Sequence, residues 1–334
     1  MSDVRRGAGV DLIVRAATDA DEPAMVELVR TSMGWPADAP LAEYLHWKHR
    51  NNPFGRSPAW VAEDGGVIVG LRTLLRWEFD VPSGPPLRAV RAVDTATAAS
   101  HRGHGVFTRL TLHGVEASNA EGNDLVFNTP NDKSRPGYLK MGWRVIGRLP
   151  VAFRPCRASG LPALARAGVP AERFSTPTTA GDPAADALAD ASALDELLDA
   201  QRSPSGLRTR RSVAYLRWRY DGFAPLHYRV IVAPGGVRHG LAVFRLRRRG
   251  RALEAAVVEV LAVDGRVRRT LLRDLVRACG ADYALLIAAP ASVAGALFAP
   301  LPRRGPILTC RPLCGDGPSR VGDWGLSLGD VELF

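Results

Sequence analysis

Several features are scarce or absent in this chain of 334 residues, and each absence excludes a class of protein. It has only four cysteines, and Cys310 and Cys314 have no second pair at zinc-ligand spacing, so we expect free thiols and no bound metal. Nowhere do eighteen apolar residues follow one another, which argues against a membrane-spanning helix. The start of the chain has Arg5 and Arg6 but no apolar stretch of signal-peptide length. Together these absences predict a cytoplasmic protein with no membrane partner.

Positive charge is in excess, carried mostly by arginine. There are 44 Lys and Arg residues against 34 Asp and Glu, which gives a formal net charge of +10. Such a balance is typical of proteins that bind nucleic acid. Apart from the arginines of residues 245–251, however, the basic residues are scattered among acidic ones. We therefore expect an arginine-rich proteome and an anionic cofactor to explain the charge, with no specific nucleic-acid partner.

Residues 90–143 carry the most informative pattern of the sequence. Alternation of Ala, Val and Thr over residues 87–98 predicts a strand, and apolar residues at helical spacing predict an amphipathic helix that stops near Gly122. An apolar run at residues 124–128 predicts the next strand. A turn rich in glycine and histidine, residues 100–105, joins the first strand to the helix. The unit is therefore strand, glycine turn, helix, strand.

The turn has the properties of an anion site. The first amides of a helix have no partner inside the helix, and the helix dipole favours negative charge there. Glycine lets the backbone close around a phosphate, Arg102 adds a permanent positive charge, and Thr108 offers a hydroxyl. The alternative is an ordinary tight turn, because the chain has neither the third glycine of GxGxxG nor a Gly-Lys-Ser/Thr sequence here.

The order of features around this turn resembles the GNAT superfamily of acetyl-CoA-dependent N-acyltransferases. In that family the turn reads Arg/Gln-x-x-Gly-x-Gly/Ala. The residues that match it are Arg102, Gly103, His104, Gly105 and Val106, and Phe107 stands at the last Gly/Ala position. The family also has an Asn after the next strand, followed seven residues later by a Tyr. Asn131 and Tyr138 have that spacing, and residues 138–143 read YLKMGW, close to the family's Tyr-x-Lys-x-Gly-Phe run.

The resemblance implies a fold and a cofactor site. The fold is α/β (α+β), a mixed, mostly antiparallel twisted sheet flanked by helices, in the order β-α-α-β-β-β-α-β. The cofactor is acetyl-CoA, with its pyrophosphate on the turn from Arg102 to Thr108. Backbone groups of the strand would pair with the pantetheine arm, and Asn131 would hold the splayed strand end or a pantetheine amide. The strand residues concerned are Thr95, Ala96 and Thr97. His101 and His104 are expected to be phosphate contacts or surface residues.

The resemblance also places two residues in the chemistry of acyl transfer. Tyr138 would donate a proton to the departing thiolate, the alternative being a packing tyrosine with its hydroxyl at the surface. We expect Ser134 to be the N-cap of an unusually short helix that carries this tyrosine, because Pro136 is tolerated only in a first helical turn. Asp94, in mid-strand, is the best candidate for a general base, since burial would raise its pKa. A hydrogen-bonded strand aspartate, with a water chain as base, remains the alternative.

The second half repeats the first. Residues 215–220 (YLRWRY) echo residues 44–49 (YLHWKH) at an offset of 171, and residues 232–241 echo the hairpin of residues 61–71. The glycine turn is degenerate in the copy, where residues 263–269 hold one glycine. We therefore expect two GNAT-like domains. The expected ranges are 1–155 for the acetyl-CoA domain, 156–205 for a linker with helices, and 206–334 for a structural or acceptor-pocket domain.

Two strands and a tail complete the expectations for the fold. Residues 144–149 and 151–154 would close the first sheet, and residues 323–330 would form a final strand or an extended cover.

Three functions stay open. The first is an N-acetyltransferase acting on a primary amine of a small molecule, such as an amino sugar, amino acid or antibiotic, as a monomer or homodimer. The second uses another acyl-CoA or a carrier-protein thioester. The third is a non-catalytic acyl-CoA-binding or nucleic-acid-binding protein.

Overall fold

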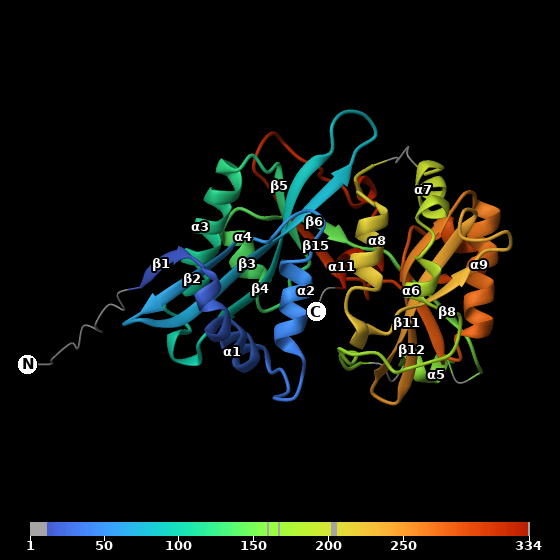
Figure 1. Ribbon diagram of the computed structural model, residues 1–334, viewed down its shortest axis with the longest axis horizontal. Coiled ribbons are helices and arrows are strands. Elements are labelled where there is room, and N and C mark those ends of the chain that lie inside the picture. Colours follow the sequence, from blue (N-terminus) through green and yellow to red (C-terminus); the bar gives the residue numbers. More distant parts are fainter. Residues whose placement is uncertain (1–11, 159, 166–167, 202–205, 333–334) are drawn as a thin grey trace, which may run out of the picture.

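Two twisted sheets lie side by side in the molecule, each with helices packed on it (Figure 1). The computed structural model describes residues 12–158, 160–165, 168–201 and 206–332. Each sheet is mixed and mostly antiparallel, with a single parallel pair between its named strands, so the expected fold class is confirmed. Among these residues no helix is both long and apolar enough to cross a membrane.

The first sheet has the order β1-β2-β3-β4-β5-β15-β6, and β9 pairs with the end of β3. Its strands are β1 (Ile13–Ala16), β2 (Ala59–Asp64), β3 (Val67–Asp80), β4 (Leu87–Thr97), β5 (Leu125–Asn128), β6 (Arg144–Arg148), β9 (Arg208–Thr209) and β15 (Ile307–Pro312). Its helices are α1 (Glu22–Met33), α2 (Leu41–His49), α3 (Val106–Ala120) and α4 (Arg135–Lys140). The expected order of elements up to β5 is therefore confirmed.

The second sheet has the order β14-β7-β13-β12-β11-β10-β8. Its strands are β7 (Val151–Pro155), β8 (Asp182–Pro183), β10 (Arg229–Val232), β11 (Gly240–Arg249), β12 (Ala252–Ala262), β13 (Tyr283–Ile287) and β14 (Ala299–Pro300). The remaining helices are α5 (Gly160–Ala165), α6 (Ala184–Ala187), α7 (Ala191–Asp199), α8 (Val213–Tyr220), α9 (Gly265–Ala278), α10 (Pro290–Val293) and α11 (Leu328–Val331). Helices α5, α6 and α7 lie in the segment expected to be a linker with helices.

The two sheets exchange one strand each. β15, from the end of the chain, lies between β5 and β6 of the first sheet. β7, from the first half of the chain, lies between β13 and β14 of the second sheet. The expectation that residues 151–154 close the first sheet is therefore wrong, because a strand from the other half fills that place. Each sheet needs a segment of the other half to be complete.

The repeat is visible at the contact between α2 and α8. The Trp47 indole donates a hydrogen bond to the Trp218 carbonyl over 2.6 Å, and the Trp218 indole donates to the Trp47 carbonyl over 2.8 Å. The two rings stack with centroids 5.5 Å apart. Equivalent residues of the two copies thus make reciprocal contacts, which joins the halves through one continuous buried cluster.

The end of the chain differs from the expectation. Residues 323–330 are an extended cover only in part: Trp324 forms an isolated bridge with Leu207 and packs on Phe79 and Phe127. The short helix α11 then begins at Leu328. Ser327 caps α11 by accepting a hydrogen bond from the Asp330 amide, and Asp330 in turn accepts from the Ser327 amide. This local capping box favours a helical turn over an extended strand.

Candidate active site

The strands β4 and β5 separate beyond the first few residues of their ladder. They pair from Ala89 to Arg91 only, while β4 continues to Thr97. A cavity of about 820 Å³ opens between the strands at this point. The sequence-predicted residues that line it are Asp94, Thr95, Ala96, Thr97, Arg102, Phe107, Asn131 and Tyr138. We call this space the donor cavity.

The glycine turn lies at the mouth of the donor cavity. Gly103 and Gly105 have φ angles of 83° and 76°, a backbone region that favours glycine, and Gly105 is the N-cap of α3. Arg102 is exposed and lines the cavity. The other predicted residues of the turn, which are not among those lining the cavity, are Gly103, His104, Gly105, Val106 and Thr108. His101 lies 2.9 Å from Asp64 of the β2–β3 hairpin through Nε2, so its ring is held at the surface next to the turn.

Val106 explains why the first helical turn approaches the sheet so closely. The residue is buried, and a Cβ added at Gly70 of β3 would lie 2.5 Å from its side chain. Gly137 has the same function for Phe107, because an added Cβ would lie 2.9 Å from that ring. Phe107 also packs edge-on against Tyr138, with centroids 5.3 Å apart. The large residue at the last Gly/Ala position of the turn thus becomes part of the cavity wall.

Tyr138 is buried, and its hydroxyl has a specific partner. Both terminal nitrogens of Arg72, on β3, donate hydrogen bonds to the Tyr138 oxygen over 2.9 Å. The Arg72 side chain is completely buried and also donates to the Thr95 hydroxyl. Because a guanidinium only donates, the Tyr138 oxygen acts as acceptor here and its own proton is available for another group. Tyr138 is therefore oriented, and the expectation of a short helix around it is met by α4.

Asn131 acts on the start of that short helix. Its side-chain oxygen accepts hydrogen bonds from the amides of Lys133 and Ser134, over 3.1 and 2.9 Å. Ser134 is the N-cap position, as expected, although its side chain makes no capping bond. Asn131 therefore fixes the turn between β5 and α4, and this turn carries Tyr138 into the cavity wall.

Asp94 is the extra residue of a β-bulge. Arg72 pairs with Thr95 and Thr73 with Val93, so Asp94 has no partner of its own across β3. Its φ angle is 42°, which is uncommon for a residue with a side chain and costs on the order of 1–3 kcal/mol. Strain of this kind persists where surrounding contacts hold the residue in place, and it is frequent at functional sites.

Those contacts come from α2. The Asp94 carboxylate lies 2.7 Å from Lys48 Nζ and 2.8 Å from His49 Nε2. Burial raises the pKa of Asp94, but the charge of Lys48 and the hydrogen bond from His49 outweigh burial, so the pKa lies below its usual value. The expected rise in this pKa was therefore wrong in direction. Asp94 is ionised near neutral pH, and it is poorly suited to accept a proton.

A second cavity, of about 640 Å³, lies between α1, α2 and the sheet. Met25, Leu45 and Leu71 are among its apolar residues, and His49 and Ser57 are among its polar ones. Asp94 lines this cavity as well as the donor cavity. The bulge residue thus lies between the two spaces and contributes to the lining of both. We call the second space the acceptor cavity.

Sequence analysis did not identify Lys48, His49, Ser57 or Arg72. One signal was present, because the repeated run reads Trp-Lys-His in the first half and Trp-Arg-Tyr in the second. Lys48 and His49 are the positions directly after the shared tryptophan at which the two otherwise similar runs differ, and this difference could have directed attention to them. For Ser57 and Arg72 the sequence carries no comparable signal.

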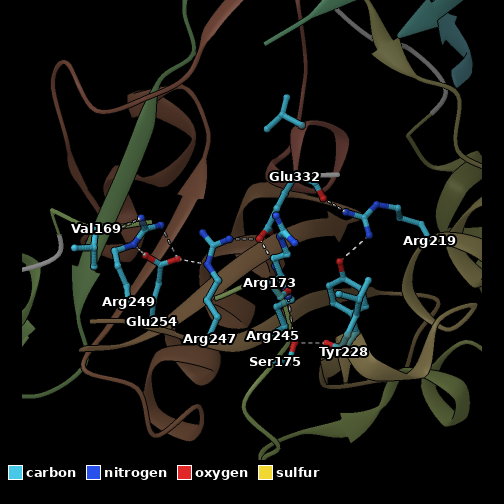
Figure 2. A network of polar contacts seen from close by, with 12 residues as sticks. Val169, Arg173, Ser175, Arg219, Tyr228, Arg245, Arg247, Arg249, Glu254 and Glu332 are labelled. Carbon is cyan, nitrogen blue, oxygen red and sulfur yellow. Dashed lines mark hydrogen bonds and ion pairs between the residues drawn. The ribbon is translucent and has the colours of Figure 1, made fainter. Parts of the chain in front are cut away.

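The end of the chain also reaches the donor cavity, which Val331 and Glu332 line. Buried arginines hold this segment. Arg91 donates to the carbonyls of Asp330 and Val331 over 2.7 and 2.6 Å. Figure 2 shows the Glu332 carboxylate between Arg245 and Arg247, and Arg219 bound both to the Glu332 carbonyl and to the Tyr228 hydroxyl.

A further ion pair extends this network, because Glu254 binds both Arg247 and Arg249. Three arginines of the run at residues 245–251 thus form ion pairs inside the protein, namely Arg245, Arg247 and Arg249. In the described part of the chain no group of three or more His, Cys, Asp or Glu side chains is arranged to hold a metal ion.

Comparisons with known proteins agree with this geometry. Residues 13–146 match the family model of the acetyltransferase (GNAT) domain. A GCN5-related N-acetyltransferase from Anabaena variabilis is 12% identical, with a TM-score of 0.66 over 91% of this chain and 73% of its own. A probable N-acyltransferase from Enterococcus faecalis is 13% identical, with a TM-score of 0.64 over 90% and 73%. Eis1 from Mycobacterium abscessus is 15% identical, with a TM-score of 0.55 over 90% and 73%.

At such identities the solved structures show a common fold, and no curated protein matches the chain in sequence. The family model covers the segment from β1 to the first residues of β6, with the glycine turn and Tyr138. The match to the acetyltransferase (GNAT) domain is thus confined to residues 13–146 of the chain.

Proposed function

We propose that the protein transfers an acetyl group from acetyl-CoA to a primary amine of a small molecule. The observation that carries this proposal is the meeting of two cavities at Asp94, one of them lined by Arg102 and Tyr138. A thioester in the donor cavity and an amine in the acceptor cavity would approach each other at the bulge. Holding two reactants in this way replaces a bimolecular encounter by a positioned reaction.

In this proposal the donor lies along the open edge of β4. The ladder with β5 ends at Arg91, so backbone groups of Thr95 to Thr97 face the cavity instead of β5. They would pair with the amides of the pantetheine arm. Arg102 and the first amides of α3 would bind the pyrophosphate, since helix N-termini favour anions.

Tyr138 would protonate the departing thiolate. Arg72 fixes the position of its oxygen with two hydrogen bonds and leaves its proton available. As the amine nitrogen attacks the acetyl carbon, the carbon–sulfur bond breaks and the sulfur takes the phenolic proton. A general acid of this kind typically contributes about 10²–10⁴-fold to the rate.

The acceptor cavity indicates the kind of amine. Its charged residues are paired with one another: Arg50 with Glu22 at 2.6 Å, and Arg76 with Glu121 at 2.9 Å. Asp19 is likewise paired, with Arg50 at 3.0 Å and with Arg56. With these charges satisfied and Met25, Leu45 and Leu71 in the wall, the cavity suits an amine on a mainly apolar body.

A screen of small amines with acetyl-CoA, read as release of free thiol, tests the proposal. We expect at least one amine with an apolar body to release thiol, at a turnover in the usual enzyme range of about 1–10³ s⁻¹. The product should be heavier by about 42 Da, the mass of an acetyl group less the hydrogen that it replaces, at that same turnover. Longer acyl-CoA donors and an acylated carrier protein belong in the same screen. If only the longer acyl-CoA donors or the acylated carrier protein react, acetyl-CoA is not the donor. If calorimetry also shows no binding of acetyl-CoA, the proposal as a whole is wrong.

A further inference from the structure

Three side chains at the acceptor cavity form a continuous hydrogen-bonded line. Ser57 Oγ lies 3.0 Å from His49 Nδ1, and His49 Nε2 lies 2.8 Å from Asp94 Oδ2. An ionised carboxylate only accepts, so Nε2 of the neutral ring carries the proton and Nδ1 is the acceptor. It follows that the Ser57 hydroxyl donates to Nδ1. All three residues line the acceptor cavity.

The line is rigidly built. Ser57 donates its backbone N–H to the His49 carbonyl over 2.9 Å, which closes the loop between α2 and β2. The Asp94 side chain is 3% exposed and the Lys48 side chain 0%, whereas the His49 side chain is 13% exposed. A fixed carboxylate thus sets both the tautomer and the orientation of a ring that still reaches the cavity.

We propose that Ser57 and His49 form a proton relay that deprotonates the acceptor amine, with Asp94 as the group that orients the ring. The inference rests on the proposed function. As the amine nitrogen bonds to the acetyl carbon, one N–H proton passes to Ser57 Oγ while the Ser57 hydroxyl proton passes to His49 Nδ1. The ring becomes an imidazolium that Asp94 stabilises. The carbon–sulfur electron pair leaves with the thiolate, which takes the Tyr138 proton. Solvent then takes the extra proton from His49 and returns a proton to Tyr138.

The charges around His49 suit this role. Burial lowers its pKa, the hydrogen bond and charge of Asp94 raise it, and the charge of Lys48 lowers it; the net result lies below the usual value. The ring is therefore neutral near pH 7 and can accept a proton. Arg50 and Arg56 line the same cavity, but both are held in ion pairs with Asp19.

A purely structural role is the competing interpretation, since the same line also fastens α2 and its loop to the bulge. The two roles differ in what they do to a pH profile. A relay works only while His49 is neutral, so kcat at saturating amine must fall as the pH drops through the pKa of His49. A structural link would change the free energy of unfolding and would leave unchanged the pH at which kcat falls, which is the acid limb of the profile.

Four variants of the full-length protein test the relay. In Ser57→Ala and His49→Gln, kcat for an amine found in the screen should fall by about 10²–10⁴-fold, the usual range for general base catalysis, with affinity for acetyl-CoA unchanged. Asp94→Asn removes a group that raises the pKa of His49, so the acid limb should move to lower pH. Lys48→Met removes a cation that lowers the pKa of His49, so the acid limb should move to higher pH.

His113→Gln is the matched control. It makes the same substitution at an exposed histidine of α3 that lies outside the residues lining either cavity. The relay is wrong if Ser57→Ala and His49→Gln keep more than half of the kcat of the control, or if the acid limb is the same in Asp94→Asn and Lys48→Met. Failure of every amine to react would instead reject the proposed function, so the two failures are distinguishable.

Discussion

The substitution Tyr138→Phe gives the sharpest test of the acid. It removes one oxygen, and the ring can still pack against Phe107 and Trp143, whose centroids lie 5.3 and 5.1 Å away. If the hydroxyl protonates the thiolate, kcat should fall by about 10²–10⁴-fold, or about 2.7–5.5 kcal/mol in activation free energy. The KM for acetyl-CoA should change little, because the interaction forms as the bond breaks.

The same substitution also has a structural cost, which the experiment must separate from the chemical one. The two N–H groups of Arg72 that donate to Tyr138 over 2.9 Å would lose their acceptor inside the protein. Leaving buried donors unsatisfied costs about 1–3 kcal/mol in the free energy of unfolding. A domain with the usual 5–15 kcal/mol stays almost fully folded after such a loss, so unfolding cannot explain a hundredfold fall in rate.

Tyr228→Phe is a matched control for this cost. Its hydroxyl also accepts a hydrogen bond from a buried arginine, Arg219, over 2.6 Å, and it is not among the residues that line the donor cavity (Figure 2). Both variants should lose a similar free energy of unfolding in denaturant titrations, while only Tyr138→Phe loses turnover. If Tyr138→Phe keeps more than half of the wild-type kcat, Tyr138 is not the acid and a water molecule takes its place.

Three further outcomes follow from the structure. Arg102→Ala should weaken acetyl-CoA binding by about 1–3 kcal/mol, as for a charge-assisted phosphate contact, and calorimetry should find one site per chain; unchanged affinity would contradict this. Binding to duplex DNA should be weak, without sequence preference, and should collapse between low and physiological salt; a specific nanomolar site would overturn the enzyme reading. Residues 1–155 expressed alone should aggregate, because β15 is missing between β5 and β6, whereas coexpression with residues 156–334 should restore a soluble complex.

The local parts of the site could be predicted from the sequence. Gly103 and Gly105 predict a turn with positive φ angles, and the helical spacing of the apolar residues after them predicts α3. The spacing of Asn131 and Tyr138 placed both on the same side of that turn, and both line the donor cavity. These features depend on neighbours close in sequence, so a short window contains the information.

Contacts between distant segments could not be predicted in the same way. The sequence left open whether Asp94 is buried or a hydrogen-bonded strand residue, and it gave no sign of the partners Lys48 and His49. They come from a helix about 45 residues away, and they lower the pKa of Asp94 where burial alone would raise it. Likewise, the apolar alternation of β7 predicts a strand without saying which sheet it joins. Only the full structure shows that β7 joins the second sheet and β15 the first.

The two copies differ at the bulge and at the start of the helix that follows it. The second sheet also has a bulge, one pair further from the matched glycine: Val243 pairs with Glu259 and Phe244 with Val257, so Val258 is the extra residue. Asp264 caps α9 by accepting a hydrogen bond from the Val267 amide, where the first half has its glycine turn. The second half thus has an apolar bulge residue and a local helix cap where the first half has a charged bulge residue and a glycine turn.

The two helix positions that follow the shared tryptophan hold different residues in the two halves and make different contacts. In the first half they are Lys48 and His49, which bind Asp94. In the second half they are Arg219 and Tyr220, at the same offset of 171 residues that separates Trp47 from Trp218. Arg219 binds the carbonyls of Gly329 and Glu332, and so holds the segment that lines the donor cavity. We infer that the second half contributes by fixing one wall of the first half's site, which is why neither half should be active alone.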